Sequence, residues 1–338
     1  MTTPKTFKAF RIHSDDAGYR SGIEQVSLDD LAPGEIVIRS AYSSVNFKDA
    51  LAGTGKGRIL RRFPLVGGID VAGHVVASTD AKFCEGDAVL VTGSGLSETR
   101  DGGYGEYARL ESRWAVALPP GLDLRESMIL GTAGFTAALA LLRMEENRQS
   151  PGLGPLAVTG ATGGVGSLAI DIFSSAGYAV HAISGKPEHA GYLKAIGAAE
   201  VLGRDALATR KPMESARFGG GLDNVGGPML ASLLAQTEPY GNVASAGLAA
   251  SHELPATVMP FIIRGVSLLG VASAGTARDI RDEVWRRLAS DWKPRHLDRI
   301  CTREATLEQL PEVFDTMLAG GSMGRTLVDL QPRSPQAA

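Results

Sequence analysis

The sequence predicts an α/β fold in which a β-rich domain is followed by a doubly wound parallel sheet. Three observations lead to this prediction. Short apolar runs separated by Gly and Pro fill the first part of the chain, helical patterns alternate with short apolar strands from about residue 125, and a glycine-rich turn joins one such strand to a helix. The length of 338 residues suits two domains, since roughly 150 residues is a common domain size.

The first segment has the pattern of a barrel-like β domain. Its strand-like runs are short, and turn formers such as Ala32-Pro33-Gly34 and Glu85-Gly86-Asp87 stand between them. We predict strands over residues 7–12, 35–42, 73–76, 88–91 and 107–109.

The second segment alternates helices with apolar strands, which is typical of parallel sheets because each crossover needs a helix. We predict its six strands over residues 154–160, 178–183, 200–202, 222–225, 241–246 and 266–271. The tail then predicts an amphipathic helix over 307–318 and a closing strand over 325–330.

The run from Leu156 to Gly166 reads as a strand, a glycine turn and the start of a helix. Gly160, Gly163 and Gly166 have the spacing that allows a tight turn, close approach of the backbone to a pyrophosphate, and close helix–strand packing. An ordinary Gly-rich turn is the alternative. The flanking elements favour a dinucleotide site, because apolar residues recur with helical spacing after the turn at Val165, Leu168, Ala169, Ile172, Phe173 and Ala176.

The end of the next strand bears on the coenzyme. NAD-dependent proteins place an Asp or Glu there, whereas this chain has Ser184-Gly185-Lys186. A carboxylate would repel a 2′-phosphate, while a hydroxyl and a lysine supply a donor and a countercharge. The pattern therefore favours NADPH over NADH, and a merely solvated Lys186 is the alternative.

Composition excludes several other classes of protein. With 44% hydrophobic residues, 21% charged residues and a net charge of −3, the chain lacks the basic excess of nucleic-acid-binding proteins. The N-terminus lacks the apolar core of a signal peptide, and we expect no stretch near the roughly 18 apolar residues of a membrane span. We therefore expect a cytoplasmic protein without membrane or nucleic-acid partners. Cys84 and Cys301 are most simply structural thiols.

Several longer motifs occur in a fixed order along the chain: Ser43-Ser-Val-Asn-Phe-Lys-Asp-Ala-Leu51, Gly68-Ile-Asp-Val-Ala-Gly73, Gly131-Thr-Ala-Gly-Phe-Thr-Ala137 and Val258-Met-Pro-Phe-Ile-Ile-Arg264. With these motifs the chain resembles, nearly end to end, the medium-chain dehydrogenase/reductase superfamily. It is most similar to the branch of acryloyl-CoA reductases and YhdH-type quinone oxidoreductases.

The resemblance implies a GroES-like catalytic domain over residues 1–125 and 295–338, and a Rossmann NADPH-binding domain over 126–294. It implies an oxidoreductase that reduces a short 2-enoyl-CoA, acryloyl-CoA to propanoyl-CoA, by hydride transfer to the β-carbon. An NADPH quinone oxidoreductase is the alternative, and a non-enzymatic NADPH-binding protein is the third. Family members pair the strand at Val266–Val271 with its twin, which implies a homodimer.

Zinc-dependent members of the superfamily carry their ligands at positions that correspond here to Asn46, Ile69-Asp70 and Thr132. Asn46 and Ile69 supply neither the thiolate nor the imidazole that zinc prefers, and the six histidines show no metal-binding spacing. We therefore expect no metal. Hydride transfer then needs a substrate polarised by its own carbonyl, such as an activated alkene or a quinone.

The resemblance also implies coenzyme contacts. Phe47 would lie beside the nicotinamide, and Leu248, Ile262 and Ser273 would line the nicotinamide and adenosine channel. The pyrophosphate and the 2′-phosphate would be contacted, respectively, by Thr162, Gly163, Gly164 and Val165, and by Ser184, Gly185, Lys186 and Arg204. A family Asn before the motif Gly324-Arg-Thr326 is missing here.

The proton donor is less clearly marked, because the loop 50–57 lacks the tyrosine of related enoyl-thioester reductases. Asn46 and Lys48 are candidate catalytic residues that would stabilise an enolate oxygen, with water as the proton source. Alternatively, Asn46 and Asp49 only fix the loop. The basic run Lys56, Arg58, Arg61 and Arg62 either receives CoA phosphates or is simply solvated.

Overall fold

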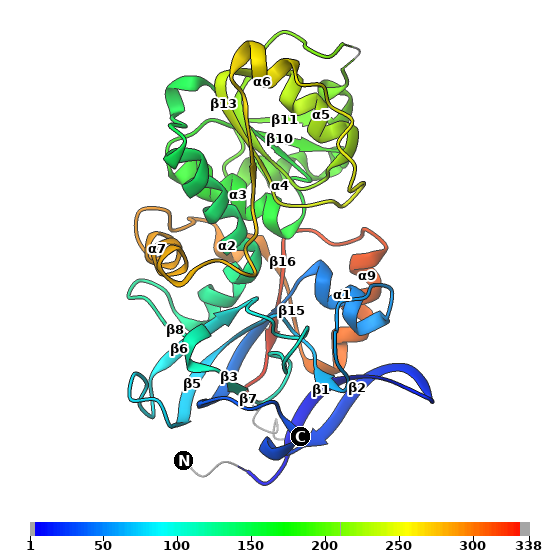
Figure 1. The fold of residues 1–338 in the computed structure, drawn as a ribbon, viewed down its shortest axis with the longest axis vertical. Coiled ribbons are helices and arrows are strands. Elements are labelled where there is room, and N and C mark those ends of the chain that lie inside the picture. The colour runs from blue at the N-terminus through cyan, green and yellow to red at the C-terminus, as the bar shows by residue number, and fades with distance from the viewer. Residues whose placement is uncertain (1–3, 210, 332–338) are drawn as a thin grey trace. The chain divides into compact units, whose positions relative to one another are not determined.

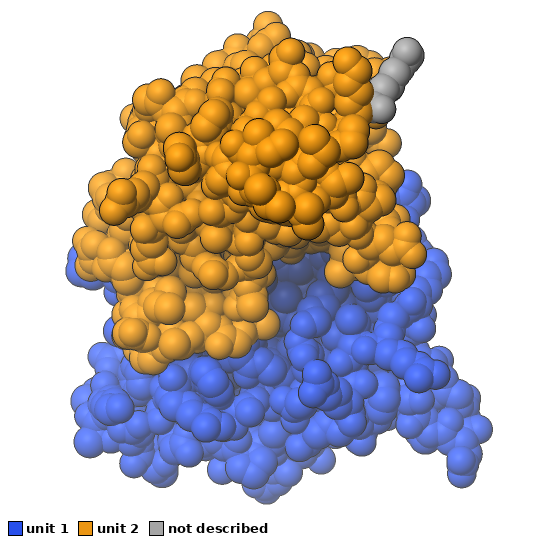
Figure 2. Space-filling view, turned by 45° about the horizontal axis from the view of Figure 1, so that its top comes forward, with its two compact units in different colours: residues 1–132, 301–338 blue, residues 133–300 orange. Residues whose placement is uncertain are grey.

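The computed structural model describes residues 4–209 and 211–331. The chain divides into two compact units, residues 1–132 with 301–338 and residues 133–300 (Figure 2). The first division falls inside helix α2 (Leu124–Glu146), and the second falls directly before strand β15 (Cys301–Ala305), rather than after residues 125 and 294.

The first unit is built from two sheets. The smaller sheet has the order β2-β1-β4, and the larger has the order β15-β16-β3-β5-β6-β8, with β7 paired to β3. The remaining strands are β1 (Phe7–Asp15), β2 (Gly18–Val26), β3 (Ile36–Val45), β4 (Leu65–Val66), β5 (Asp70–Ser78), β6 (Ala88–Thr92), β7 (Tyr107–Leu110), β8 (Val116–Ala117) and β16 (Arg325–Asp329).

Helix α1 (Phe47–Thr54) is held against α9 (Leu310–Leu318) at one side of this unit. Three buried aromatic rings anchor the packing: Phe10 contacts Tyr104 and Phe314 edge-on, with centroid distances of 6.4 and 5.7 Å. Such edge-to-face pairs are a favoured aromatic geometry. The Phe314 ring lies against Gly53 of α1, so the packing holds the helix that carries Phe47 and Lys48.

The second unit contains a six-stranded parallel sheet of order β11-β10-β9-β12-β13-β14. Figure 1 labels three of its strands, β10, β11 and β13. Its strands are β9 (Leu156–Thr159), β10 (Val180–Ser184), β11 (Glu200–Gly203), β12 (Phe218–Asp223), β13 (Thr237–Ser245) and β14 (Ser267–Gly270). Its complete helices are α3 (Gly164–Ser175), α4 (Ala190–Ala195), α5 (Gly227–Ala235), α6 (Met259–Arg264), α7 (Arg278–Leu288) and α8 (Leu297–Ile300). The strand order reverses between β9 and β12, so the predicted doubly wound fold is confirmed.

One predicted strand was displaced along the chain. The sequence indicated residues 222–225, but β12 runs over Phe218–Asp223 and the chain turns after it. Gly219, Gly220 and Gly221 have poor intrinsic strand propensity, which hid the start of the strand. They occur there because β12 is buried between β9 and β13.

The expectation about long apolar stretches also needs correction. Among the described residues, α2 has the length and hydropathy of a membrane span. However, 83% of its most apolar window is buried inside the protein, as in the core helix of a globular domain. The helix is also interrupted at Gly131, whose φ of 49° and ψ of −154° are not helical.

Candidate functional site

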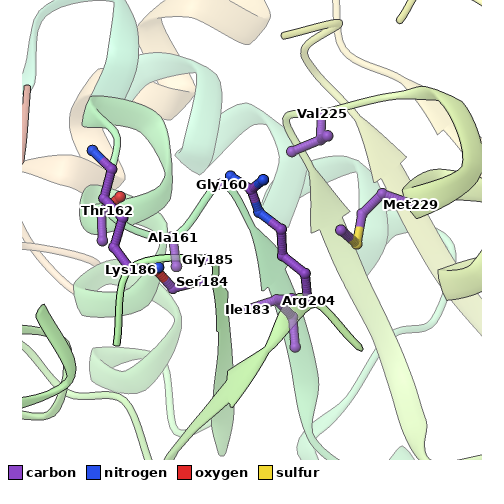
Figure 3. A pocket seen from close by; sticks show the side chains of 10 residues that line it. All are labelled: Gly160, Ala161, Thr162, Ile183, Ser184, Gly185, Lys186, Arg204, Val225 and Met229. Carbon is purple, nitrogen blue, oxygen red and sulfur yellow. The ribbon is translucent and has the colours of Figure 1, made fainter. Parts of the chain in front are cut away.

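A pocket lies at the carboxyl ends of β9 and β10 in the second unit, where an open parallel sheet binds ligands (Figure 3). It brings together five of the predicted coenzyme residues: Thr162, Ser184, Gly185, Lys186 and Arg204. The lining also includes Gly160, the first glycine of the predicted turn. Sequence reasoning did not assign the other four lining residues, which are Ala161, Ile183, Val225 and Met229.

The glycine turn forms one wall of this pocket. A Cβ at Gly166 would stand 2.4 Å from the carbonyl oxygen of Gly160, so the helix can approach the turn this closely only with glycine there. Gly163 is the N-cap of α3, and Gly164 and Val165 form its first turn. Their backbone N–H groups belong to the helix end that attracts anions. This geometry fits a pyrophosphate.

The second wall carries positive charge. Ser184 ends β10 and pairs with Gly203 of β11, which sets Arg204 beside Gly185. A Cβ at Gly185 would lie 2.5 Å from Arg204 Nε, so an alanine there would require the arginine side chain to shift. The Ser184 hydroxyl accepts a hydrogen bond from the Lys186 N–H at 3.0 Å. None of the described residues lining the pocket is acidic, and the arrangement fits an additional phosphate.

Six other predicted contact residues of this unit do not line the pocket. Gly163, Gly164 and Val165 directly follow the lining residue Thr162, whereas Leu248, Ile262 and Ser273 lie far from it in the sequence. Leu248 and Ile262 are 67% and 76% exposed, which is unusual for large apolar side chains. Ser273 accepts a hydrogen bond from Thr136 Oγ1 at 2.9 Å, and its carbonyl accepts one from Arg281 at 3.1 Å. The loop that carries Ser273 is therefore fixed, while the roles of Leu248, Ile262 and Ser273 stay predictions.

In the first unit, a buried network is centred on Asp70. The Asp70 carboxylate accepts hydrogen bonds from Ser44 Oγ at 2.7 Å, Asn46 Nδ2 at 2.8 Å, and Thr132 N and Oγ1 at 2.9 and 2.6 Å. The guanidinium of Arg325 lies beside this cluster and donates to Asn46 Oδ1 at 3.2 Å. Asn46, Asp70 and Thr132, which lie at the three places that the resemblance relates to zinc-ligand positions, therefore meet here in a hydrogen-bonded cluster.

Both polar atoms of the Asn46 side chain are hydrogen-bonded within this network. Its amide nitrogen donates to both Asp70 and Asp49, the latter at 3.2 Å, and its oxygen accepts from Arg325. A carboxamide has only two N–H donors, so in this arrangement none remains for a substrate oxygen. Asp49 also accepts from the backbone N–H of Asn46 and of Ile69. These contacts favour the alternative in which Asn46 and Asp49 fix the start of α1, and a catalytic role for Asn46 stays a prediction.

The two residues that follow Asn46 differ in their surroundings. Phe47 is 54% exposed, so its ring can pack against a bound ring. The ammonium group of Lys48 forms an ion pair with Glu98, which holds the lysine in place. Any role of Lys48 toward a substrate oxygen would have to compete with this pair.

Burial changes the ionisation of the network. Burial and the nearby Asp70 raise the pKa of Asp49 to about 7. Burial also lowers the pKa of Arg325, although Asp70 and Asp49 oppose that effect. Residues 4–209 and 211–331 contain no group of three or more His, Cys, Asp or Glu side chains that could hold a metal ion. Metal-independent activity remains a prediction for solution experiments.

Two family models match the chain. Residues 32–120 match the alcohol dehydrogenase GroES-like domain, and residues 164–290 match the domain described as zinc-binding dehydrogenase. The second match covers none of Asn46, Ile69 and Thr132.

Individual relatives match nearly end to end. The chain is 44% identical to Putative quinone oxidoreductase YhfP of Bacillus subtilis, over 96% of this chain and 99% of the relative. The solved structure of yhfP, with NAD bound, superposes with a TM-score of 0.93. Acrylyl-CoA reductase AcuI of Ruegeria pomeroyi is 42% identical, over 96% and 99% of the two chains.

The structure of a third relative has been solved with NADP, the coenzyme that carries the 2′-phosphate. The yhdH oxidoreductase of Salmonella enterica, in complex with NADP, is 42% identical over 96% of this chain and all of that one, with a TM-score of 0.92. The barrel-like first unit, the Rossmann sheet and these full-length matches lead to one conclusion. The chain belongs to the medium-chain dehydrogenase/reductase family of oxidoreductases, in the branch that contains AcuI-type acrylyl-CoA reductases and YhfP/YhdH-type quinone oxidoreductases.

Proposed function

We propose that the protein reduces a short 2-enoyl-CoA with NADPH, converting acryloyl-CoA to propanoyl-CoA. The observation that carries the coenzyme assignment is the pocket wall of Ser184, Lys186 and Arg204. Two cations and a hydroxyl suit a 2′-phosphate, and no lining residue would repel it. The 42% identity to an acrylyl-CoA reductase supports the substrate class.

The chain offers a coenzyme site with distinct parts. Thr162, Gly163, Gly164 and Val165 would hold the pyrophosphate at the start of α3, and the wall at Gly185 would hold the 2′-phosphate. Bound NADPH supplies a hydride from C4 of its nicotinamide. Phe47 is proposed to pack against that ring, and the residues proposed for the channel are Leu248, Ile262 and Ser273.

The chemistry requires polarisation by the substrate itself. Conjugation with the thioester carbonyl makes the β-carbon electrophilic, so the hydride forms a C–H bond there and the π electrons move to an enolate oxygen. A proton from water then forms the C–H bond at the α-carbon. Since the amide of Asn46 is committed to Asp70 and Asp49, we assign Asn46 to positioning Phe47 and Lys48 rather than to stabilising the enolate oxygen.

The position of the label tests this reaction. With C4-deuterated NADPH, propanoyl-CoA should carry deuterium at C3, and in D₂O with ordinary NADPH it should carry deuterium at C2. The reversed pattern, or the absence of labelled thioester, would reject the proposed reaction.

The competing function is NADPH-dependent quinone reduction, which the 44% identity to YhfP favours. Steady-state NADPH oxidation against acryloyl-CoA, crotonoyl-CoA and a benzoquinone separates the two functions. A kcat/KM for the quinone above that for every thioester would transfer the assignment to this alternative. Tight NADPH binding without turnover of any of these substrates would indicate a non-enzymatic protein.

We also propose that the protein works in the cytoplasm as a homodimer. β14 is an edge strand of its sheet, and an uncovered apolar edge is an open pairing site. Sedimentation at micromolar concentration should show a dimer, and a monomer would contradict this assembly.

A further inference from the structure

A cationic loop connects α1 to β4 in the first unit. Lys56, Arg58, Arg61 and Arg62 all lie in this loop, and all four side chains are exposed. We call residues 56–62 the basic loop. Four cations within seven residues repel one another. Such a cluster of like charges favours a function in which the loop binds an anion.

The backbone of the basic loop is anchored. Leu60 is only 8% exposed and belongs to the hydrophobic core of the first unit. The N–H of Arg61 donates to the carbonyl of Glu98 at 2.7 Å, and the N–H of Ile59 donates to that of Gly57 at 2.9 Å. The cations therefore project from a held backbone, which lowers the entropic cost of binding an anion.

The charges of the loop are not neutralised within the protein. Among residues 4–209 and 211–331, no carboxylate lies within 4.0 Å of these four cations, while the nearby Lys48 and Arg100 pair with Glu98 and Glu111. The positive charge of the loop also affects the nearby residue Arg100. Burial lowers the pKa of Arg100, and Arg113 and Arg62 lower it further.

Two exposed aromatic rings border the loop. Tyr19 and Phe63 are 40% and 38% exposed, and their rings meet edge-on with centroids 5.8 Å apart. The Tyr19 hydroxyl donates to the carbonyl of Ala52 near the end of α1, and Phe63 directly follows Arg62. A planar base can stack on such rings while its phosphates meet the neighbouring cations.

We propose that the basic loop, with Tyr19 and Phe63, binds the adenosine 3′-phosphate and pyrophosphate of the CoA thioester. This assignment rests on the proposed function, because it names how that substrate is held. The loop begins just after α1, the helix that carries Phe47 and Lys48. It is distinct in sequence and in unit from Lys186 and Arg204, which we assign to the coenzyme.

The kinetic test compares two thioesters. In the variant Arg61→Ala/Arg62→Ala, KM for acryloyl-CoA should rise about tenfold with little change in kcat. A tenfold change corresponds to about 1.4 kcal/mol, close to the lower end of the range for one lost hydrogen bond to a charged group. KM for the acryloyl thioester of N-acetylcysteamine, which has no phosphates, should not change. The matched control Arg295→Ala/Arg299→Ala removes two exposed arginines elsewhere and should leave both KM values unchanged.

A binding measurement separates this proposal from the proposed reaction. Calorimetry of the NADPH-loaded protein should detect adenosine 3′,5′-bisphosphate binding that weakens about tenfold in Arg61→Ala/Arg62→Ala. Inorganic phosphate at the same concentration should bind much more weakly, because it lacks the base.

Three outcomes would overturn the site: no bisphosphate binding by the wild type, equal bisphosphate affinity in wild type and variant, or equal rises in KM for both thioesters. Normal bisphosphate binding without turnover of either thioester would instead reject the proposed reaction and retain the site.

Discussion

Gly131 offers a strict test of the buried network, because replacement by Ala places a methyl group inside it. A Cβ at this position would lie 2.6 Å from Asp70 Oδ2, 2.7 Å from Ser44 Oγ and 3.0 Å from Arg325 Nη2. The backbone there, at φ 49° and ψ −154°, is also a conformation that residues with a side chain rarely adopt. Gly131→Ala must therefore shift either the backbone or the charged groups.

The magnitude follows from these two costs. A strained backbone conformation costs about 1–3 kcal/mol, and loss of one hydrogen bond to a buried charged group costs about 1.5–3 kcal/mol. We expect Gly131→Ala to lower the free energy of unfolding by about 3–5 kcal/mol, a large part of the roughly 5–15 kcal/mol typical of folded proteins. The melting temperature should fall by about 10 °C.

Urea and thermal unfolding, with Gly22→Ala as the matched control, measure this effect. Gly22 lies in β2 of the same unit, has an ordinary φ, and a Cβ there would meet nothing within 4 Å. Gly22→Ala should be neutral or stabilising by about 0.5–1 kcal/mol. A loss below about 1 kcal/mol for Gly131→Ala would refute the reasoning, because the network would then tolerate a methyl group.

Three further predictions concern the coenzyme, the metal and pH. Lys186→Ala/Arg204→Ala should weaken NADPH binding by tenfold or more and leave NADH binding nearly unchanged, and equal losses would show that these residues do not contact the 2′-phosphate. Chelators should not inhibit, and elemental analysis should find much less than one zinc per chain, whereas one tightly bound zinc would contradict the expectation. Because the pKa of Asp49 rises from 3.8 to about 7 on folding, the wild type should lose stability as pH rises through that window. The destabilisation caused by Asp49→Asn should therefore shrink between pH 5 and pH 8 in urea titrations. A destabilisation that grows with pH would show that folding lowers the pKa of Asp49 instead of raising it.

Several features followed from the sequence because they depend on neighbours in the chain. The turn Gly160–Gly166 has its own strand and helix on either side, so three glycines were enough to predict it. The alternation of apolar strands with helices predicted the parallel sheet, because burial on both faces leaves a continuous apolar run. Ser184 and Lys186 were found for the same reason, since they lie at the end of β10 and just after it.

Other elements had no local signal. β2 reads Gly-Tyr-Arg-Ser-Gly-Ile-Glu-Gln-Val, and β15 reads Cys-Thr-Arg-Glu-Ala, without a sustained apolar alternation. Both are outer strands of their sheets, so pairing with β1 and β16 defines them more than burial does. Val225 and Met229 of the pocket were missed because they lie far along the chain from the glycine turn. Val225 follows β12 and Met229 lies in α5, and only the pairing of β12 with β9 brings them to the pocket.

The sequence by itself determined the fold class and the chemical character of the coenzyme site, because both are written in short runs whose spacing limits the backbone. Only the tertiary structure brought Asp70, Asn46, Thr132 and Arg325 into one buried network. Asn46 and Arg325 are 279 positions apart, and nothing local to either side chain indicates its partner. Burial explains this network: inside the protein a polar group must be hydrogen-bonded, and the amide that the sequence offered as a catalytic donor is hydrogen-bonded to Asp70 and Asp49.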